Sequence, residues 1–269
     1  MDFEAVRARL NLLAVLPNLE DVVRYDPEMA ELVKGSRVTI QFSVAGGLKA
    51  FVRLADGACT VGRGSAKAAS VDGSRTGADG SRTGAEVVLW FASAAHLNRM
   101  FDGKAQPIPL RGFRHLGFLK KEFTRLTDRM AYFLKPTPGL LADPGYLAMN
   151  TRLTLNTAVY AVPVLLAHDP EVSRFRGMFT SGSIALRVLP DGPNVGLALG
   201  PDEIRPIKGD IEKPTALIAL GSLEIANAFL NGTMDTFAAV AKGDVAVWGQ
   251  LPKVDTLALV LDRLAKYLS

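Results

Sequence analysis

The side chains most able to do chemistry are scattered through this sequence. The histidines are His96, His115 and His168, and the single cysteine is Cys59. No histidine belongs to an HExxH motif, and one cysteine cannot provide the ligand set of a zinc site. The serines of Ser181-Gly182-Ser183 lack the GxSxG pattern of a hydrolase nucleophile. We therefore expect no catalytic residue, no metal site and no cofactor.

The composition is that of a folded globular chain. Of 269 residues, 48% are hydrophobic and 22% are charged, which allows a substantial core. The N-terminal residues lack the pattern of a signal peptide, and no apolar run approaches the ~18 residues of a membrane span. We expect a soluble, cytoplasmic protein. The formal net charge of +4 is too small to indicate nucleic-acid binding.

The sequence contains two related copies of one pattern. An Asp-Pro-Glu motif occurs at 26–28 and again at 169–171, and Asp128-Arg129 has a counterpart in Asp262-Arg263. We align residues 48–64 with residues 183–200 through their Asp-Gly turns. Repeats of this length indicate duplicated structural units.

These repeats predict two domains, residues 1–138 and residues 139–269. Three prolines and two glycines in residues 135–145 are typical of a linker. The heptapeptide DGSRTGA occurs twice in succession within residues 65–85, which we predict to be a mobile surface loop.

The hydrophobic periodicity predicts the same order of elements in both copies. Helical spacing at the start gives way to short alternating strands, then to a helix, a strand and a closing amphipathic helix. In the first copy the strands are expected at 38–44, 50–54, 59–61 and 86–91. Because their connections look short, the sheet should be mostly antiparallel. The fold class is therefore α+β, with about five strands per domain covered by helices on one side.

Residues 213–249 resemble the sterol carrier protein 2 domain family. The resemblance lies in an apolar strand, a helix that ends at a glycine, and a Lys-Gly-Asp strand. The matching positions are Phe229, Gly232, Ala239, Lys242, Gly243, Asp244 and Gly249 in the second copy, and Phe101, Gly103 and Gly112 in the first. In the second copy, Met178–Ser181 is interpreted as a shortened first strand.

This resemblance implies a sheet covered by helices with an apolar tunnel between the two layers. It implies binding of fatty acids, acyl-CoA, sterols or similar lipids, without catalytic residues. Met and aromatic side chains adapt well to such ligands. Residues of the closing helices are the other candidates, although apolar stripes of this kind more often fill a core. The candidate ligand-binding residues are Phe229, Met234, Phe237, Trp248, Leu257, Leu261 and Leu264, together with Phe101, Phe123 and Met130 in the first copy.

A cluster of basic residues lies on the closing helix of the first copy. These are Lys120, Lys121, Arg125 and Arg129. Such a face attracts anionic lipid headgroups, and transient contact with a membrane surface is one interpretation. The alternative is an ordinary solvated helix face.

Three hypotheses for function remain. The leading one is non-catalytic binding or transfer of an apolar small molecule by a monomer with internal pseudo-symmetry. The second is a structural or interaction module, a pseudo-dimer with filled cores whose apolar faces pack on each other or on a partner enzyme. The third and weakest is an enzyme that modifies a lipid or polyketide held in the tunnel.

Overall fold

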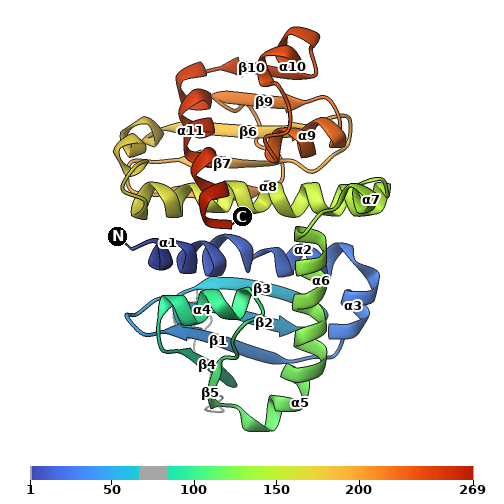
Figure 1. Ribbon diagram of the computed structural model, residues 1–269, viewed down its shortest axis with the longest axis vertical. Helices are drawn as coiled ribbons and strands as arrows, with labels where there is room; N and C mark the ends of the chain where they lie inside the picture. The colour runs from blue at the N-terminus through green and yellow to red at the C-terminus, as the bar shows by residue number, and fades with distance from the viewer. Residues whose placement is uncertain (1, 67–83, 269) are drawn as a thin grey trace. The chain divides into compact units, whose positions relative to one another are not determined.

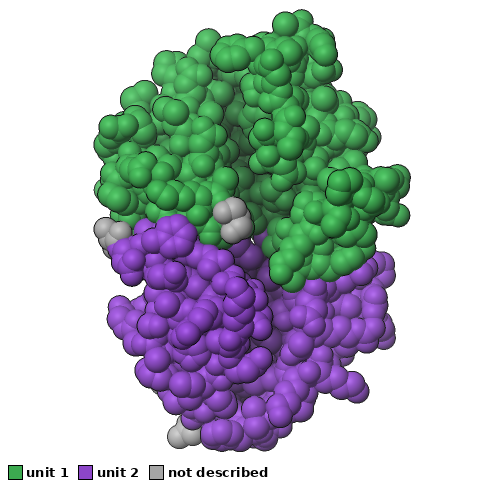
Figure 2. Space-filling view, in the orientation of Figure 1, with its two compact units in different colours: residues 1, 131–269 green, residues 2–130 purple. Residues whose placement is uncertain are grey.

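The computed structural model describes residues 2–66 and 84–268, and it divides into two compact units. Unit 1 comprises residues 131–269 and unit 2 residues 2–130 (Figures 1 and 2). The division falls inside helix α6 (Thr124–Leu134), a few residues before the segment 135–145 expected as a linker. That segment forms helix α7 (Pro138–Leu141) and the first turn of the next helix. Most of the expected mobile loop, residues 67–83, lies outside the described residues.

Unit 2 begins with helices, continues with a sheet and ends with helices. Asp26 caps a short helix by accepting from the backbone N–H of Glu28 and Met29, as the Asp-Pro-Glu motif predicts. Ser93 caps another helix through the N–H of His96. The elements are α1 (Phe3–Leu10), η1 (Asn11–Val15), α2 (Asn18–Tyr25), α3 (Pro27–Val33), β1 (Val38–Val44), β2 (Lys49–Ala55), β3 (Ala58–Arg63), β4 (Val87–Phe91), α4 (Ala94–Phe101), β5 (Ile108–Arg111), η2 (Phe113–His115), α5 (Leu116–Phe118), η3 (Leu119–Phe123) and α6.

Unit 1 has the same plan with one long first helix. Asp143 and Ser222 cap helices by accepting from backbone N–H groups. After α7, the elements are α8 (Pro144–His168), η4 (Ser173–Phe179), β6 (Gly182–Val188), β7 (Val195–Leu199), β8 (Ile204–Lys208), β9 (Ala216–Leu220), α9 (Leu223–Leu230), α10 (Thr236–Lys242), β10 (Val245–Gly249) and α11 (Leu251–Leu268).

The two sheets have one topology. The strand order is β3-β2-β1-β4-β5 in unit 2 and β8-β7-β6-β9-β10 in unit 1. Helices and one five-stranded sheet make up each unit, so the predicted α+β fold with two five-stranded domains is confirmed.

The sheets are mixed rather than a purely antiparallel meander. β4 runs parallel to β1, and β9 runs parallel to β6. In unit 1 the chain between β8 and β9 reaches across two strands, and Ile211 from it packs over Gly196 on β7. A connection that crosses the sheet in this way permits one parallel pair within an otherwise antiparallel sheet, whereas the short connections expected from the sequence would not.

The alignment of the two copies made from the sequence was also wrong, because it matched strands that occupy different places in the two sheets. We had matched the hairpin in residues 48–64 to residues 183–200, which form β6 and β7. The topology instead makes β6 the counterpart of β1 and β7 the counterpart of β2, because β1 and β6 are each the first strand of their unit and the central strand of their sheet. The first strand of unit 1 is a full seven-residue strand that starts at Gly182, whereas Met178 lies in η4. Asp-Gly turns are local signals that do not identify a strand's place in the sheet.

Matching hydrogen bonds fix the correspondence residue by residue. The backbone N–H of Thr39 donates to the Glu86 carboxylate, and that of Ser183 donates to the Thr215 hydroxyl. Gly112 and Gly249 each have a positive φ, and a Cβ on either would strike the backbone at the start of β4 or β9. The final strand of each unit therefore approaches the neighbouring strand too closely for a side chain.

Candidate functional site

One face of the unit 1 sheet is apolar and covered by helices. The ladder registers place alternate residues of β6, β7 and β9 on this face. They are buried, and α8, α9 and α11 pack on the sheet (Figure 1). The inward-facing residues are Ile184, Leu186, Val188, Val195, Leu197, Ala216, Ile218 and Leu220.

Helix α11 presents an apolar stripe to this layer. Leu257 and Val260 are buried, while Leu261 and Leu264 on the same side of the helix are only half-buried. Leu259 lies on the opposite side and is 51% exposed. In the space-filling view, the surface of unit 1 is hollowed between α11 and the segment that carries α9 (Figure 2). Half-buried leucines beside a hollow offer apolar area that a ligand could cover.

A buried carboxylate anchors the C-terminal half of α11. Asp169 is 0% exposed, and its Oδ2 accepts from Arg263 Nη2 at 3.1 Å and from the Tyr267 hydroxyl at 2.7 Å. Its Oδ1 accepts from the backbone N–H of Glu171 at 2.7 Å. Arg263 also pairs with the Glu171 carboxylate at 2.8 Å. Charge-assisted bonds of this kind hold α11 to the turn that follows α8.

The same contacts displace two pKa values. Burial acts to raise the pKa of Asp169, but the hydrogen bonds from Tyr267, from the Glu171 N–H and from Arg263 outweigh it, and the pKa falls below the ordinary carboxyl value. Burial, followed by the hydrogen bond to Asp169, raises the pKa of Tyr267 to about 12. Both shifts favour the protonation states that keep the cluster bonded at neutral pH.

Unit 2 has the corresponding anchor. Asp26 accepts from Arg129 Nε at 2.6 Å, so the two related Asp and Arg positions form the same ion pair in both units. The duplicated motifs seen in the sequence are thus a shared device for attaching the closing helix.

Helix α9 is attached to α8 by buried amides. Asn227 Nδ2 donates to Asn150 Oδ1 at 2.6 Å, and Asn231 Nδ2 donates to Asn227 Oδ1 at 3.0 Å. Asn150 and Asn227 are buried, and each has a hydrogen-bond partner in an environment where an unpaired amide would be costly. This network holds α9 in place on one side of the hollow.

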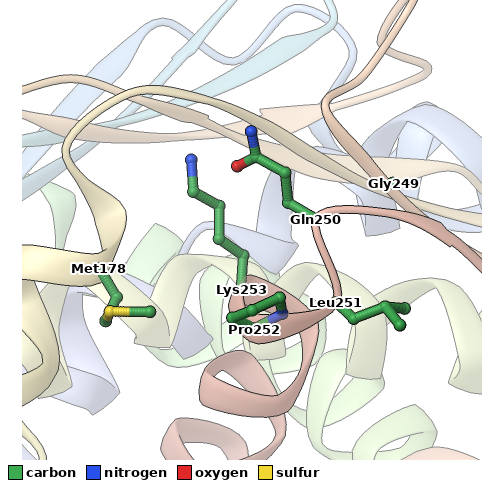
Figure 3. A pocket seen from close by; sticks show the side chains of 6 residues that line it. All are labelled: Met178, Gly249, Gln250, Leu251, Pro252 and Lys253. Atoms are coloured by element: carbon green, nitrogen blue, oxygen red, sulfur yellow. The ribbon is translucent and has the colours of Figure 1, made fainter.

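A pocket of about 420 Å³ lies at the start of α11. Figure 3 shows Met178 and Leu251 on either side, Pro252 between them, and the longer side chains of Gln250 and Lys253 extending away. The Lys253 ammonium donates to the Ser181 carbonyl oxygen. Pockets of this size hold small molecules, and apolar walls are suited to an apolar molecule. The volume and the lining belong to unit 1 alone.

The predicted ligand-binding residues of unit 1 fall into a buried or half-buried group and an exposed group. Leu257, Leu261 and Leu264 lie together on the inner side of α11, and Phe229 is half-buried on α9. Met234 is half-buried just before α10. Phe237 on α10 is 91% exposed, and Trp248 is 54% exposed.

Trp248 lies on the wrong face for the predicted pocket. It pairs with Leu217, whose side chain points away from the helices, whereas its neighbour Val247 pairs with the inward-facing Ile218. A change of one residue in register moves a side chain to the opposite face of a sheet. From the sequence Trp248 was expected near the pocket, because the register of β10 on β9 cannot be read from neighbouring residues.

The candidate ligand-binding residues of the first copy are mostly core residues. Phe123 and Met130 are buried, and Phe101 is half-buried at the end of α4.

Among the basic residues of the closing helix of unit 2, Arg129 pairs with Asp26, and Arg125 pairs with Glu28. Lys120 and Lys121 lie on an exposed part of the closing helix. The basic face is therefore narrower than the sequence indicated, because two of its charges hold the helix to its own unit.

Sequence reasoning missed several residues near the hollow and the pocket. Met178, Gln250 and Lys253 line the pocket, yet they belong to no periodic pattern, and only the packing of η4 on α11 brings them together. Ile225 is half-buried on α9, one turn before Phe229. Its four-residue spacing from Phe229 is a signal that could have identified it. Helix α8, which supplies Asn150, was expected only as helical structure at the start of the second copy, without its bounds or its length.

The described residues contain no group of three or more His, Cys, Asp and Glu side chains arranged to hold a metal ion. Within residues 2–66 and 84–268, no helix combines the length and apolar character needed to cross a bilayer.

Comparisons with known proteins found similar solved structures. No protein-family model and no curated protein matches the chain. Sterol carrier protein 2 is 22% identical, with a TM-score of 0.30, over 41% of this chain and 92% of its own. Sterol carrier protein 2 like 2 from Aedes aegypti is 17% identical, with a TM-score of 0.28, over 41% and 96%. A UbiJ-SCP2 ubiquinone synthesis protein is 12% identical, with a TM-score of 0.30, over 38% and 86%.

Proposed function

We propose that the protein binds or transfers an apolar small molecule of lipid type without chemically altering it. The observation that carries this proposal is the half-buried apolar stripe of α11 beside the hollow in unit 1 (Figure 2). The pocket at the start of the same helix adds apolar surface. The resemblance of residues 213–249 to sterol carrier protein 2 domains supports the same ligand class.

The physical basis would be burial of apolar surface. Each Å² of apolar ligand area removed from water contributes roughly 25 cal/mol, so covering a lipid chain offsets the loss of its freedom on binding. α11 would form one wall of the site, with its C-terminal half anchored by the Asp169 cluster. Fatty acids, acyl-CoA and sterols are the ligand classes we propose.

Native mass spectrometry of the purified full chain, before and after incubation with palmitic acid and cholesterol, tests the proposal. We expect an added lipid mass that disappears on denaturation. A bare mass under both conditions would contradict lipid binding and favour the alternative of an interaction module with filled cores.

Two leucines of α11 provide a matched pair of variants. Leu261→Lys places a charge on the half-buried side of the helix, whereas Leu259→Lys places the same charge on the exposed side. We expect Leu261→Lys to weaken lipid binding at least tenfold, because the ligand would have to cover a charged group. Leu259→Lys should bind like the parent protein. Equal effects of the two variants would count against this wall of the site.

Contact with an anionic membrane is a second part of the proposal. Lys120 and Lys121 remain available for headgroups, and each basic residue near such a surface contributes about 1 kcal/mol. Cosedimentation with phosphatidylserine vesicles should fall when both are changed to Gln. Unchanged cosedimentation would remove this part of the proposal and leave lipid binding intact.

A further inference from the structure

We infer that the chain has a single lipid site, in unit 1, and that unit 2 is a copy whose corresponding interior is filled by its own side chains. This inference rests on the proposed function. It is carried by comparing corresponding positions of the two units, which share one sheet topology.

The correspondence is fixed by pairing and by shared contacts. In the parallel ladders, Ile40 pairs with Val87 and Ile184 pairs with Ala216, which aligns the central strands. The ion pairs of Asp26 with Arg129 and of Asp169 with Arg263 align the closing helices. The N-cap serines, Ser93 and Ser222, align α4 with α9.

Three aromatic rings fill the interior of unit 2. Phe42 stacks on Phe91 with ring centroids 6.2 Å apart, and Phe123 packs against Phe42 at 6.4 Å. All three are buried, and they come from β1, β4 and η3. They therefore occupy the space between the sheet and the closing helix. The corresponding residues of unit 1 are Leu186, Leu220 and Leu257.

The surrounding positions reinforce the difference. Leu97, Leu126 and Val87 are fully buried in unit 2. Their counterparts in unit 1 each have a smaller side chain. Those counterparts are Ala226, Val260 and Ala216.

The reverse exchange occurs across β2 and β7, where Val195 and Leu197 of unit 1 replace the smaller Ala50 and Val52 of unit 2. It also occurs on the closing helix, where Leu261 and Tyr267 of unit 1 correspond to Thr127 and Phe133 of unit 2. The added methyl groups do not match the three rings lost. At the compared positions of the sheet, α9 and the closing helix, unit 1 thus has less side-chain volume than unit 2, although close packing is the rule for protein interiors.

The facing helix differs in polarity as well. In unit 2, His96 lies with its ring edge-on to Phe91 at 5.5 Å, and its Nε2 lies 2.9 Å from the Gln106 carbonyl oxygen. The counterpart in unit 1 is Ile225, which is half-buried. On the closing helix, the counterpart of Thr127 is the half-buried Leu261. Unit 1 therefore has half-buried apolar side chains in place of polar ones where an apolar ligand would lie.

The two tryptophans of the chain provide a test that does not disturb the interior. Trp90 is on β4 in unit 2 and Trp248 is on β10 in unit 1. We would titrate Trp90→Phe and Trp248→Phe variants with the fluorescent fatty acid cis-parinaric acid and measure energy transfer from the remaining tryptophan. We expect one probe per chain, with efficient transfer from Trp248 and weaker transfer from Trp90.

A second experiment exchanges the residues that fill the interior of one unit for their counterparts in the other. Leu220→Phe with Ala226→Leu copies unit 2 into unit 1, and we expect at least a tenfold loss of probe affinity. Phe91→Leu with Leu97→Ala makes the opposite exchange in unit 2 and should leave affinity for the first probe within twofold. Circular dichroism spectra of both variants would establish that they fold.

The outcomes separate the two proposals. Two probes per chain, or stronger transfer from Trp90, would overturn the single-site inference while leaving lipid binding in place. Binding that survives filling of unit 1 would do the same. Failure of the unaltered chain to bind either cis-parinaric acid or the lipids tested above would overturn the proposed function itself.

Discussion

The carboxylate of Asp169 should be the main electrostatic anchor of α11, and replacing it with asparagine isolates that role. Asparagine keeps the Oδ1 acceptor that bonds the Glu171 N–H at 2.7 Å, so the turn after α8 should stay capped. The change removes the negative charge that Arg263 contacts at 3.1 Å and Tyr267 at 2.7 Å. The effect therefore measures the anchor and not the cap.

The magnitude follows from the burial of these groups. Removing one partner of a buried ion pair costs about 3–5 kcal/mol. Arg263 retains its pair with Glu171 at 2.8 Å, which lessens the penalty. We therefore expect Asp169→Asn to lower the free energy of unfolding by about 2–4 kcal/mol. Urea unfolding followed by tryptophan fluorescence in a Trp90→Phe background measures this loss of stability, because the signal of Trp248 then reports on unit 1 alone.

The effect should depend on pH with a definite sign. Because the pKa of Asp169 is lowered in the folded protein, its contribution is present above the ordinary carboxyl pKa of about 4. The contribution is lost as pH falls from there through the folded-state value. The difference between the parent and Asp169→Asn should thus be constant near pH 7 and shrink below about pH 4.

The related pair in unit 2 is the control. Asp26 contacts Arg129, but Phe133 occupies the position that corresponds to Tyr267, so this carboxylate lacks the hydroxyl partner. Asp26→Asn should therefore cost less than Asp169→Asn. A loss below about 1 kcal/mol for Asp169→Asn, or a difference from the parent that ignores pH, would refute the assignment of this anchor.

Three further predictions concern packing and exposure. Gly249→Ala should lower the free energy of unfolding by at least about 2 kcal/mol, because φ is positive and the new Cβ would strike the Thr215 carbonyl oxygen; thermal unfolding would show it, and an unchanged midpoint would contradict it. Asn227→Leu should cost about 1–3 kcal/mol by leaving Asn150 without its amide partner, and hydrogen exchange should rise in α9; unaltered exchange would argue against the network. Phe237→Ser should change stability by less than about 0.5 kcal/mol, since the side chain is 91% exposed, and a larger loss in urea titration would show that it packs on something.

The sequence by itself determined the local elements and the existence of two copies. Capping is a local event, so Asp26, Ser93 and Ser222 could be assigned from the residues that follow them. The period of the apolar residues likewise placed the closing helices and most strands. The repeated Asp and Arg positions indicated duplication before any contact between them was known.

Only the tertiary structure decided how those elements meet. Pairing of β9 with β6 and of β4 with β1 is non-local, so the parallel ladders and the true alignment of the copies could not be read from neighbouring residues. The register of β10 on β9 sets the face on which Trp248 lies. Ion pairing to Glu28 and Asp26 gave Arg125 and Arg129 a structural role that their charge alone did not reveal. Side-chain volume acts through the same long-range contacts, because three phenylalanines fill unit 2 only when β1, β4 and the closing helix bring them together.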